Sequence, residues 1–193
     1  MKKILFFSNN KNKINEIKHQ FRSWNGDVLS LSDYDFKKEP KENGVNFIEN
    51  AKIKSDYGFE NFKVPCFADD SGICIEALNW GPGVLSKRFM NKFYSKEDCF
   101  SYILEKVKES NKTKAYFNST ISLTIKENQN LVFVGKSHGN ISSSIKGNKG
   151  FGYDPIFIPL GYNKTFAEMS LFTKNTISHR ANSIIKLKNF LFN

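Results

Sequence analysis

The sequence predicts an α/β protein built on a long mixed β-sheet. The first observation is a strand–turn–helix opening, in which a short apolar run is followed by apolar residues at helical spacing. The second is a pair of β-rich runs in which apolar and polar residues alternate, as they do in half-buried antiparallel strands. A chain that combines βα units with an antiparallel hairpin favours a mixed sheet over a purely parallel one.

Strands and helices are predicted to alternate in the N-terminal half. After the first apolar run, Ile14, Ile17 and Phe21 recur at helical spacing. A later apolar run leads into the acidic segment 69–72, which we place at the end of a strand. The elements expected in this half are strands at residues 3–7, 28–31, 65–68 and 73–75 and helices from about 11 and over 47–57.

The C-terminal half is predicted to contain the antiparallel hairpin and the last helix. Gly81-Pro82-Gly83 requires a turn, and Asn128-Gln129-Asn130 is typical of a hairpin connection. The remaining expected elements are a helix over 96–108, hairpin strands over 115–126 and 131–144, a Gly-rich loop over 147–152, a strand over 155–159 and a final helix from about Ser178.

Composition excludes several classes of protein. The 193 residues are 39% hydrophobic and 15% aromatic, which supplies ample material for a core and excludes intrinsic disorder. No apolar run approaches the roughly 20 residues of a membrane span, and the apolar start is too short for a signal peptide. The formal net charge of +10 fits a polyanionic partner, but it also fits the Lys- and Asn-rich bias of an AT-rich coding sequence.

The cysteines indicate a reduced compartment. There are three, Cys66, Cys74 and Cys99, without CxxC spacing, and three histidines, so a zinc site is not expected. Cys66 and Cys74 lie in apolar strand runs, where we expect them to pack. A cytoplasmic location fits this usage best. A nucleophile elbow is also excluded, because the chain contains no GxSxG.

The segment Ser8-Asn9-Asn10-Lys11-Asn12-Lys13 lies between the first predicted strand and helix. Free backbone N–H groups at a helix start favour an anion, and a lysine in the first turn opposes the helix dipole unless something negative is bound. An anion-binding loop fits this pattern, and so does a polar N-cap followed by solvated lysines. A Walker A loop is excluded, because the GK[ST] ending is absent.

Two adjacent carboxylates, Asp69 and Asp70, follow the third predicted strand. Neighbouring side chains on an extended chain point to opposite faces, so we expect the two carboxylates to serve different purposes. One of them can face a cleft and hold Mg²⁺, for which carboxylate oxygens are natural ligands. A turn with Asx caps is the structural alternative for this segment.

Two further polar segments lie in the last quarter of the chain. The closely spaced glycines of the 147–152 loop let a backbone approach a ligand, and neighbouring aromatics can stack on a base, although a flexible turn fits too. Ser178 is predicted to cap the last helix. His179 and Arg180 then oppose the helix dipole, which indicates a second anion-facing region or a surface-exposed pair.

Taken in this order, the segments resemble the inosine triphosphate pyrophosphatase family, the Ham1/RdgB-like nucleoside-triphosphate diphosphatases. The matching stretches are SNNKNKINEIK, GVNFIENAKIK, FADDSGICIEAL, GPGVLSKRF, GNKGFGYDPIF, and TFAEMS followed by KNTISHRAN. They extend from Ser8 to about Asn182, nearly the whole chain. Each stretch alone is unspecific, but six in series are a strong signal.

The resemblance implies a single domain over residues 1–193, with an elongated mixed α/β fold and two lobes around a central nucleotide-binding cleft. It implies a homodimer that uses Mg²⁺ to cleave non-standard purine nucleoside triphosphates (ITP, dITP, XTP) to the monophosphate and pyrophosphate, which removes them from the nucleotide pool. Neither nucleic acid nor a membrane is expected as a partner. A Maf-type pyrophosphatase of other nucleotides and a basic nucleic-acid-binding module are the alternatives.

The resemblance also implies roles for individual residues. Asp70 would bind Mg²⁺ or activate the attacking water. The triphosphate would be held by Ser8, Asn9, Asn10, Lys11, Asn12 and Lys13. The other substrate-binding residues implied are Ser71, Ser86, Arg88, Phe151, Gly152, Tyr153, Asp154, Lys174, His179 and Arg180.

Two departures from the family pattern affect these assignments. Asn9 stands where the family usually has glycine, and we expect asparagine to be tolerated because it also accepts left-handed backbone geometry. The family tends to have paired acidic residues before the position of Gly44, where this chain offers Glu39 and Glu42. Of these two, we favour Glu42 as a second metal ligand.

Overall fold

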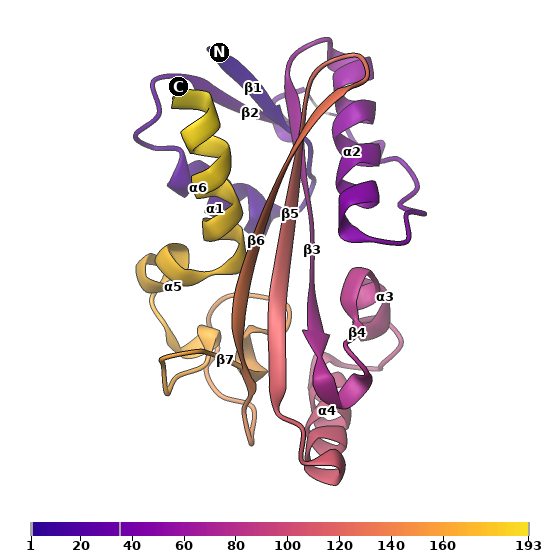
Figure 1. The fold of residues 1–193 in the computed structure, drawn as a ribbon, viewed down its shortest axis with the longest axis vertical. Helices are drawn as coiled ribbons and strands as arrows, with labels where there is room; N and C mark the ends of the chain where they lie inside the picture. Colours follow the sequence, from indigo (N-terminus) through magenta and orange to yellow (C-terminus); the bar gives the residue numbers. More distant parts are fainter. Residues whose placement is uncertain (1, 35, 193) are drawn as a thin grey trace. The chain divides into compact units, whose positions relative to one another are not determined.

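The computed structural model describes residues 2–34 and 36–192 and confirms an α/β fold with a mixed sheet (Figure 1). The strands pair in the order β2-β1-β3-β5-β6-β7, and β4 pairs with β3. Their bounds are β1 Lys3–Phe6, β2 Asp27–Ser30, β3 Cys66–Ile75, β4 Gly81–Pro82, β5 Lys114–Lys126, β6 Gln129–Ile141 and β7 Phe157–Pro159. β1 runs parallel to β2 and β3, whereas β4 is antiparallel to β3 and β7 to β6.

Four of the helices, α1, α2, α4 and α5, begin at polar caps that the sequence supplies. Asn10, Asn46, Ser95 and Ser170 each accept a backbone N–H of the first turn that follows. The helices are α1 Lys11–Gln20, α2 Phe47–Phe62, α3 Ser86–Met90, α4 Lys96–Ser110, α5 Leu171–Ile177 and α6 His179–Phe192. Within the described part of the chain, none of these helices combines the length and the apolar character needed to cross a bilayer.

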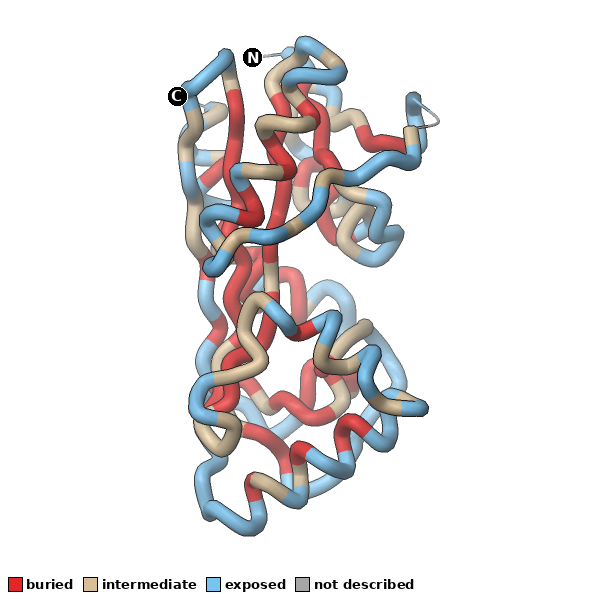
Figure 2. Tube along the Cα trace, turned by 90° about the vertical axis from the view of Figure 1, so that its right-hand side faces the viewer, coloured by how far each residue is buried: buried red, intermediate tan, exposed pale blue. Residues whose placement is uncertain are grey.

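The chain divides into two compact units, each with its own core. Unit 1 comprises Met1–Asp70, Ser119–Gly135 and Ser183–Asn193, and unit 2 comprises Ser71–Asn118 and Lys136–Asn182. In Figure 2 the buried residues form long red stretches along the strands, while exposed positions recur on the helices.

In unit 1, alternate residues of the strands belong to two different apolar clusters, one on each face. On β1, Ile4 and Phe6 pack with α1 and α6, whereas Leu5, together with Phe7 just after the strand, packs with residues of α2. Figure 1 shows α2 on the opposite side of these strands from α1 and α6. The two faces of the strands therefore meet different helices, as a period of two requires.

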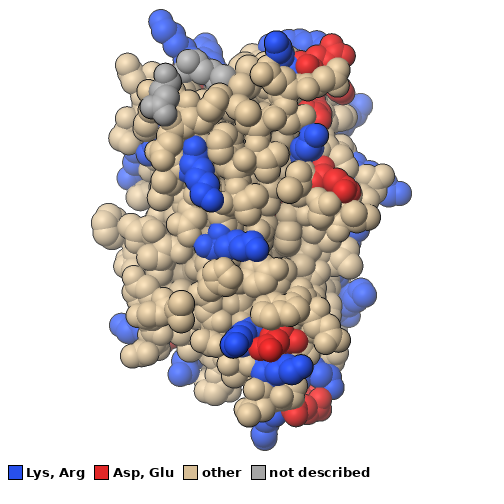
Figure 3. Space-filling view, in the orientation of Figure 1, with Lys and Arg blue, Asp and Glu red and all other residues tan. Residues whose placement is uncertain are grey.

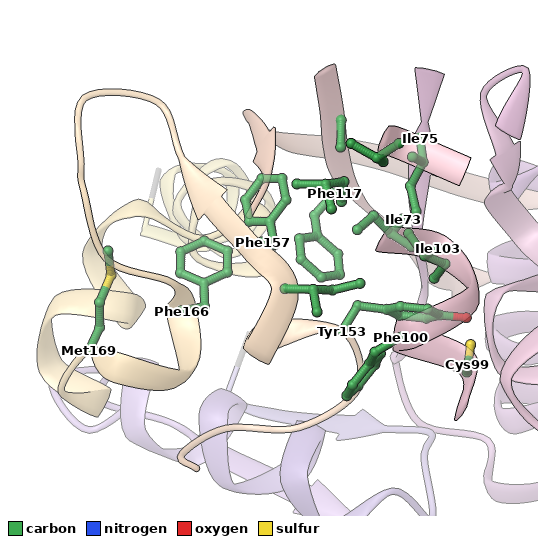
Figure 4. Close-up of a cluster of buried hydrophobic side chains, with 14 residues drawn as sticks. Ile73, Ile75, Cys99, Phe100, Ile103, Phe117, Tyr153, Phe157, Phe166 and Met169 are labelled. Atoms are coloured by element: carbon green, nitrogen blue, oxygen red, sulfur yellow. The ribbon is translucent and has the colours of Figure 1, made fainter. Parts of the chain in front are cut away.

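The core of unit 2 is rich in aromatic side chains (Figure 4). Phe117 from β5 packs edge-to-face on Phe157, with ring centroids 4.8 Å apart, and lies 6.0 Å from Phe166. Residues of β3 and α4, such as Ile73 and Ile103, close the same cluster. This core and the side chains packed against it hold six of the 19 phenylalanines of the chain: Phe89, Phe93, Phe100, Phe117, Phe157 and Phe166.

Several sequence-based boundaries are wrong. The acidic segment does not end a strand and is not a turn, because β3 continues through it to Ile75. Asp69 and Asp70 can remain in the sheet since both have buried polar partners, which are described below. α5 was not predicted, and β6 ends at Ile141. Pro155 belongs to a 3₁₀ turn over Asp154–Ile156, so β7 covers only Phe157–Pro159.

Candidate functional site

The loop that follows β1 lies beside the N-terminal part of β3. Phe6 is in register with Phe67 across the parallel pair, and the Phe7 N–H donates to the Phe67 carbonyl at 2.8 Å. The chain then turns at Ser8 into α1, while β3 continues through Asp69 and Asp70. Ligands of α/β proteins bind outside the carboxyl ends of parallel strands, which is where this loop lies.

Asn10 is the N-cap of α1. Its Oδ1 accepts the backbone N–H groups of Asn12 and Lys13 at 3.0 and 3.2 Å, and Ser8 Oγ accepts the Asn10 N–H. The polar cap is therefore confirmed, but the lysine at the third helical position is not simply solvated. The Lys13 ammonium lies 2.9 Å from Asp69 Oδ2, which supplies negative charge at the helix start.

Asn9 is held by a carboxylate. Its backbone N–H and its Nδ2 both donate to Glu39 Oε1, at 3.3 and 3.0 Å. The backbone of Asn9 does not have a positive φ. The expectation that Asn9 replaces the family glycine by adopting left-handed geometry is therefore wrong. Asn9 and Lys11 line a pocket of about 490 Å³ to which Lys13 does not contribute; its other lining residues are Ile14, Asn15, Lys18, Leu31, Ser32, Phe36 and Lys37.

Asp69 and Asp70 face opposite sides of β3, as their adjacency predicts. Asp69 shares its face with Phe67, which packs with α1 and α6, and it accepts a hydrogen bond from Ser119 on β5. Asp70 shares its face with Ala68, on the side of α2, and contacts Lys54 of that helix. The two carboxylates therefore have separate surroundings and separate partners.

Lys54 joins two carboxylates on the α2 side. Its Nζ lies 3.0 Å from Glu42 Oε1 and 3.4 Å from Asp70 Oδ1. Asn50, one helical turn earlier, donates from Nδ2 to Asp70 Oδ2 at 3.4 Å and accepts the Gly44 N–H at 2.8 Å. Asn50 thereby ties the loop that carries Glu42 to the strand that carries Asp70.

The neighbouring charges shift the pKa values of Asp70 and Lys54. Burial raises the pKa of Asp70, and Glu42 and Asp69 raise it further, while Lys54 and Lys13 partly oppose this. Burial also works against the Lys54 ammonium, but the carboxylates of Asp70, Glu42 and Asp69 outweigh it and raise the pKa of Lys54. Lys54 is therefore a charged, buried lysine.

Lys54 and Asn50 are not among the site residues expected from the sequence. Both lie within the matching stretch GVNFIENAKIK, and their spacing of four places them on one face of α2. That face also carries Ala51, Ser55 and Gly58, all of them buried. A lysine at a position of the buried helical face was the available signal, because lysine is almost never buried without a partner.

The donor set fits one divalent cation. We name Lys13, Glu42, Lys54, Asp69 and Asp70 the lysine–carboxylate cluster; its three carboxylates face two ammonium groups. This excess of negative charge favours a cation. Across residues 2–34 and 36–192, no group of three or more His, Cys, Asp or Glu side chains forms a metal site. Mg²⁺ needs fewer, since it is usually held by one or two carboxylates together with water and substrate phosphates.

A second polar cluster lies in unit 2, around Phe151. Lys174 Nζ lies 2.6 Å from Asp154 Oδ2 and 4.6 Å from the centroid of the Phe151 ring. Asp154 Oδ2 also accepts the Phe151 N–H at 2.8 Å. Gly150 has a φ of +74°, and a Cβ there would collide with the Asp154 carboxylate. This glycine is therefore required for the close approach of the loop to Asp154.

His179 and Arg180 are buried at the start of α6, so the surface-exposed alternative is wrong. The Arg180 guanidinium is 5.6 Å from the Phe151 ring centroid and donates to Ser71 Oγ at 2.9 Å. The His179 ring stacks on Phe117, with centroids 4.6 Å apart and planes at 11°. Ser178 caps the helix as predicted, accepting the Ala181 N–H.

Four residues with implied substrate contacts lie elsewhere in unit 2 or serve its packing. The Tyr153 hydroxyl donates to the Ser86 carbonyl at 2.7 Å, within the aromatic core. Ser86 Oγ accepts the Ile73 N–H and donates to the Gly83 carbonyl. Arg88 is exposed on α3, and Gly152 has a φ of +62°. The structure thus groups Ser71, Phe151, Asp154, Lys174 and Arg180, which we name the Phe151 cluster.

Comparison with known proteins agrees with the motifs. The model of the Ham1 family matches residues 4–190. A dITP/XTP pyrophosphatase of Christiangramia forsetii is 40% identical over 98% of both chains, and one of Porphyromonas gingivalis is 36% identical over 99% of this chain and 98% of its own.

Solved structures agree as well. A HAM1 protein from Coxiella burnetii has a TM-score of 0.89 at 32% identity, covering 100% of this chain and 99% of its own. The Ham1 protein of Staphylococcus aureus has a TM-score of 0.86 at 36% identity, covering 98% of each chain. The resemblance drawn from the six motifs is confirmed: the chain belongs to the Ham1 family.

Proposed function

We propose that this chain hydrolyses non-standard purine nucleoside triphosphates (dITP, ITP and XTP) to the monophosphate and pyrophosphate, with Mg²⁺ as cofactor. The full-length similarity to proteins named dITP/XTP pyrophosphatases supports the substrate class. The lysine–carboxylate cluster is the observation that carries the chemistry: Asp70 and Glu42 converge on Lys54, next to a helix start that presents Lys13.

The cluster suits a polyanion that arrives with a metal ion. We assign Lys13, Lys54 and the start of α1 to the phosphates, because a triphosphate needs cationic groups before a nucleophile can approach. Asp70 and Glu42 would hold Mg²⁺. A metal ion bound there supplies charge neutralisation for the phosphates and stabilises the charge that develops on the departing pyrophosphate.

Asp70 is the residue we assign to the attacking water. A carboxylate at this place can position the water and take its proton. The water oxygen forms a bond to the α-phosphorus, the α–β phosphoanhydride bond breaks, and pyrophosphate leaves with the bonding electrons. The proton of the water passes to Asp70.

We assign recognition of the base to the Phe151 cluster and His179. The Phe151 ring offers a face for stacking, and Arg180 can donate to the 6-oxo group of hypoxanthine or xanthine. Adenine presents an amino donor at that position, which would leave such a donor unsatisfied in the bound state. Guanine keeps the 6-oxo group, so its rejection must come from its 2-amino group.

The products and the position of the new bond test this function. The purified chain is incubated with Mg²⁺ and dITP, ITP, XTP, ATP, GTP or modified pyrimidine triphosphates in ¹⁸O-water. We expect pyrophosphate as product, ¹⁸O in the monophosphate alone, and loss of turnover on chelation of Mg²⁺. Nucleoside diphosphate with orthophosphate would contradict the bond cleaved, and a preference for pyrimidine substrates would favour the Maf-type alternative.

We also infer a homodimer in a reducing, cytoplasmic compartment. The three cysteines are free and buried, which fits a reducing environment. Sedimentation at micromolar concentration should give twice the 22.2 kDa mass of the chain. Basic side chains are scattered over the face seen in Figure 3 and not gathered into one strip, which supports a nucleotide over a nucleic acid as the partner.

A further inference from the structure

Asp69 has no part in the chemistry assigned so far, yet it is the most enclosed carboxylate of the cluster. Its side chain is 0% exposed. Oδ2 lies 2.9 Å from Lys13 Nζ, and Oδ1 accepts a hydrogen bond from Ser119 Oγ at 2.6 Å. Both oxygens are therefore engaged by the protein itself.

The hydroxyl behind Asp69 is itself held. Ser119 Oγ and Ser183 Oγ lie 2.8 Å apart, and both serines are fully buried. An ionised carboxylate only accepts, so Ser119 must give its single hydroxyl proton to Asp69. Ser183 must then be the donor between the two serines. The direction of the relay is fixed, from α6 through β5 to β3.

Lys13 is the cation at the other end. Its Nζ lies 3.2 Å from the Asp69 carbonyl, and Lys54 donates to the same carbonyl at 3.0 Å. The two ammonium groups converge on one backbone oxygen and repel each other, so each needs nearby negative charge to stay there. Lys54 has Glu42 and Asp70, and the Asp69 carboxylate supplies the charge for Lys13.

We propose that Asp69 is a positioning residue: the Ser183–Ser119 relay fixes its carboxylate, and the carboxylate fixes the Lys13 ammonium where it meets the phosphates of the substrate. The inference rests on the proposed function. A lysine held in place before binding loses little freedom when the phosphate arrives, so affinity rises without new contacts. Asp69 thus acts through Lys13 and touches neither water nor metal, in contrast to Asp70.

Binding of inorganic pyrophosphate tests this without turnover. Calorimetric titrations, with and without Mg²⁺, compare the wild type with Asp69→Asn, Ser119→Ala, Lys13→Ala and the Lys13→Ala/Asp69→Asn double variant. We expect Asp69→Asn to weaken binding about tenfold and Ser119→Ala about threefold, as expected for loss of a charged and of a neutral hydrogen-bond partner. In the Lys13→Ala background, Asp69→Asn should have no further effect.

Kinetics separate the two neighbouring carboxylates. Asp69→Asn should raise KM for dITP with kcat within about threefold of wild type, whereas Asp70→Asn should lower kcat. Asp33→Asn is the matched control, since Asp33 also lies in unit 1 and accepts from a serine hydroxyl, that of Ser30. It should change neither constant.

Three results would overturn the proposal. Equal or tighter pyrophosphate binding by Asp69→Asn would mean that Asp69 only competes with phosphate. A full effect of Asp69→Asn in the Lys13→Ala background would mean that it does not act through Lys13. A fall in kcat at unchanged KM would place Asp69 in the chemistry itself.

Folding and the proposed function are controlled separately. If Asp69→Asn does not unfold cooperatively, Ser119→Ala and Ser183→Ala decide the question, because each weakens the relay and leaves the carboxylate in place. If the wild type releases no pyrophosphate from any purine triphosphate, the proposed function fails. The pyrophosphate titrations still report on the Asp69–Lys13 coupling in that case.

Discussion

Each unit contains a buried lysine between acceptors, but the two lysines are held in different ways. In unit 2, Lys174 and Asp154 form a close pair at 2.6 Å, both almost fully buried, beside the Phe151 ring. In unit 1, Lys54 lies at 3.0 and 3.4 Å from two carboxylates, within a cluster where negative charge is in excess. The first arrangement joins one lysine to one carboxylate in close contact, whereas the second joins one lysine to two carboxylates at longer distances.

The difference separates two tasks of a binding protein. A balanced, buried pair keeps its geometry whether or not a ligand is present, which suits the recognition of a planar base. A cluster with excess charge and longer contacts can exchange partners, which suits phosphates that arrive with a metal ion. Under the proposed function, base recognition and phosphate chemistry therefore lie in different parts of the chain.

The largest effect is expected where the close pair is broken. Asp154→Ala removes the partner of a buried ammonium, which costs about 3–5 kcal/mol of unfolding free energy. Urea denaturation of the variant measures the loss. Glu109→Ala is the matched control, because Glu109 pairs with Lys106 at 2.7 Å on an exposed helix surface. Its unfolding should match the wild type, and equal losses in both variants would contradict the role of burial.

The next effect concerns catalysis in the lysine–carboxylate cluster. Asp70→Asn removes the proposed base and one proposed metal ligand, so kcat should fall by about 10²-fold or more while the fold is kept. Stopped assays of pyrophosphate release at saturating Mg²⁺ measure this, with circular dichroism as the check on folding. Near-normal turnover by a folded variant would remove Asp70 from the chemistry.

Discrimination between bases tests the Phe151 cluster. We expect kcat/KM for dITP, ITP and XTP to exceed that for ATP and GTP by about 10²-fold, or about 2.7 kcal/mol. Arg180→Ala should shrink the gap as well as slow turnover, because it removes the proposed donor to the 6-oxo group. Competition assays with mixed substrates measure the ratio. If the ratio of kcat/KM values is unchanged in Arg180→Ala, Arg180 does not recognise the base.

The two candidate acidic ligands are separated by their metal requirement. Glu42→Gln should raise the Mg²⁺ concentration for half-maximal activity about tenfold, because the carboxylate contacts Lys54 beside Asp70. Glu39→Gln should leave this requirement unchanged, since Glu39 accepts from Asn9 instead. The reverse order of effects would exchange the two assignments.

The smallest effect is expected for the reactivity of the three cysteine thiols, which should be low in the folded protein. Burial raises the pKa of all three thiols, that of Cys99 to about 11, so few thiolates exist at neutral pH. Alkylation by iodoacetamide should be slow in the native protein and fast in urea, as mass spectrometry can follow. Rapid native labelling at one site would show that the unit carrying that thiol opens.

The sequence predicted those parts of the fold whose pattern is local. The β1–α1 opening and the alternation of Ile121, Leu123 and Ile125 were visible because burial on one face imposes a period on the chain. The continuation of β3 through Asp69 was not visible, because two adjacent aspartates ordinarily favour a turn. Here they stay in the sheet through partners on α1, α2 and β5, which are distant in sequence.

The same limit applies to the candidate site. Lys13, Asp70, Lys174 and Arg180 were selected from motifs, while Lys54 and Asn50 were overlooked within a motif already quoted. Their importance comes from what α2 packs against, and a helical pattern alone does not reveal the chemistry of the opposing strand. Ser86 and Tyr153 were selected from the same motifs, yet their hydroxyls bond to the backbone of unit 2.

Side chains of β3 alternate between its two faces, so the surroundings of each aspartate depend on its exact position in the strand. One residue inserted ahead of Asp69 would set Asp69 in the present place of Asp70, beside Lys54, and would move Asp70 to the opposite face, in the present place of Ser71. Two inserted residues would return each carboxylate to its own face, but two positions further along the strand. The presence of two aspartates is therefore insufficient for the chemistry. Both residues are of the same type, and only an odd or even position along the strand decides which one faces α2.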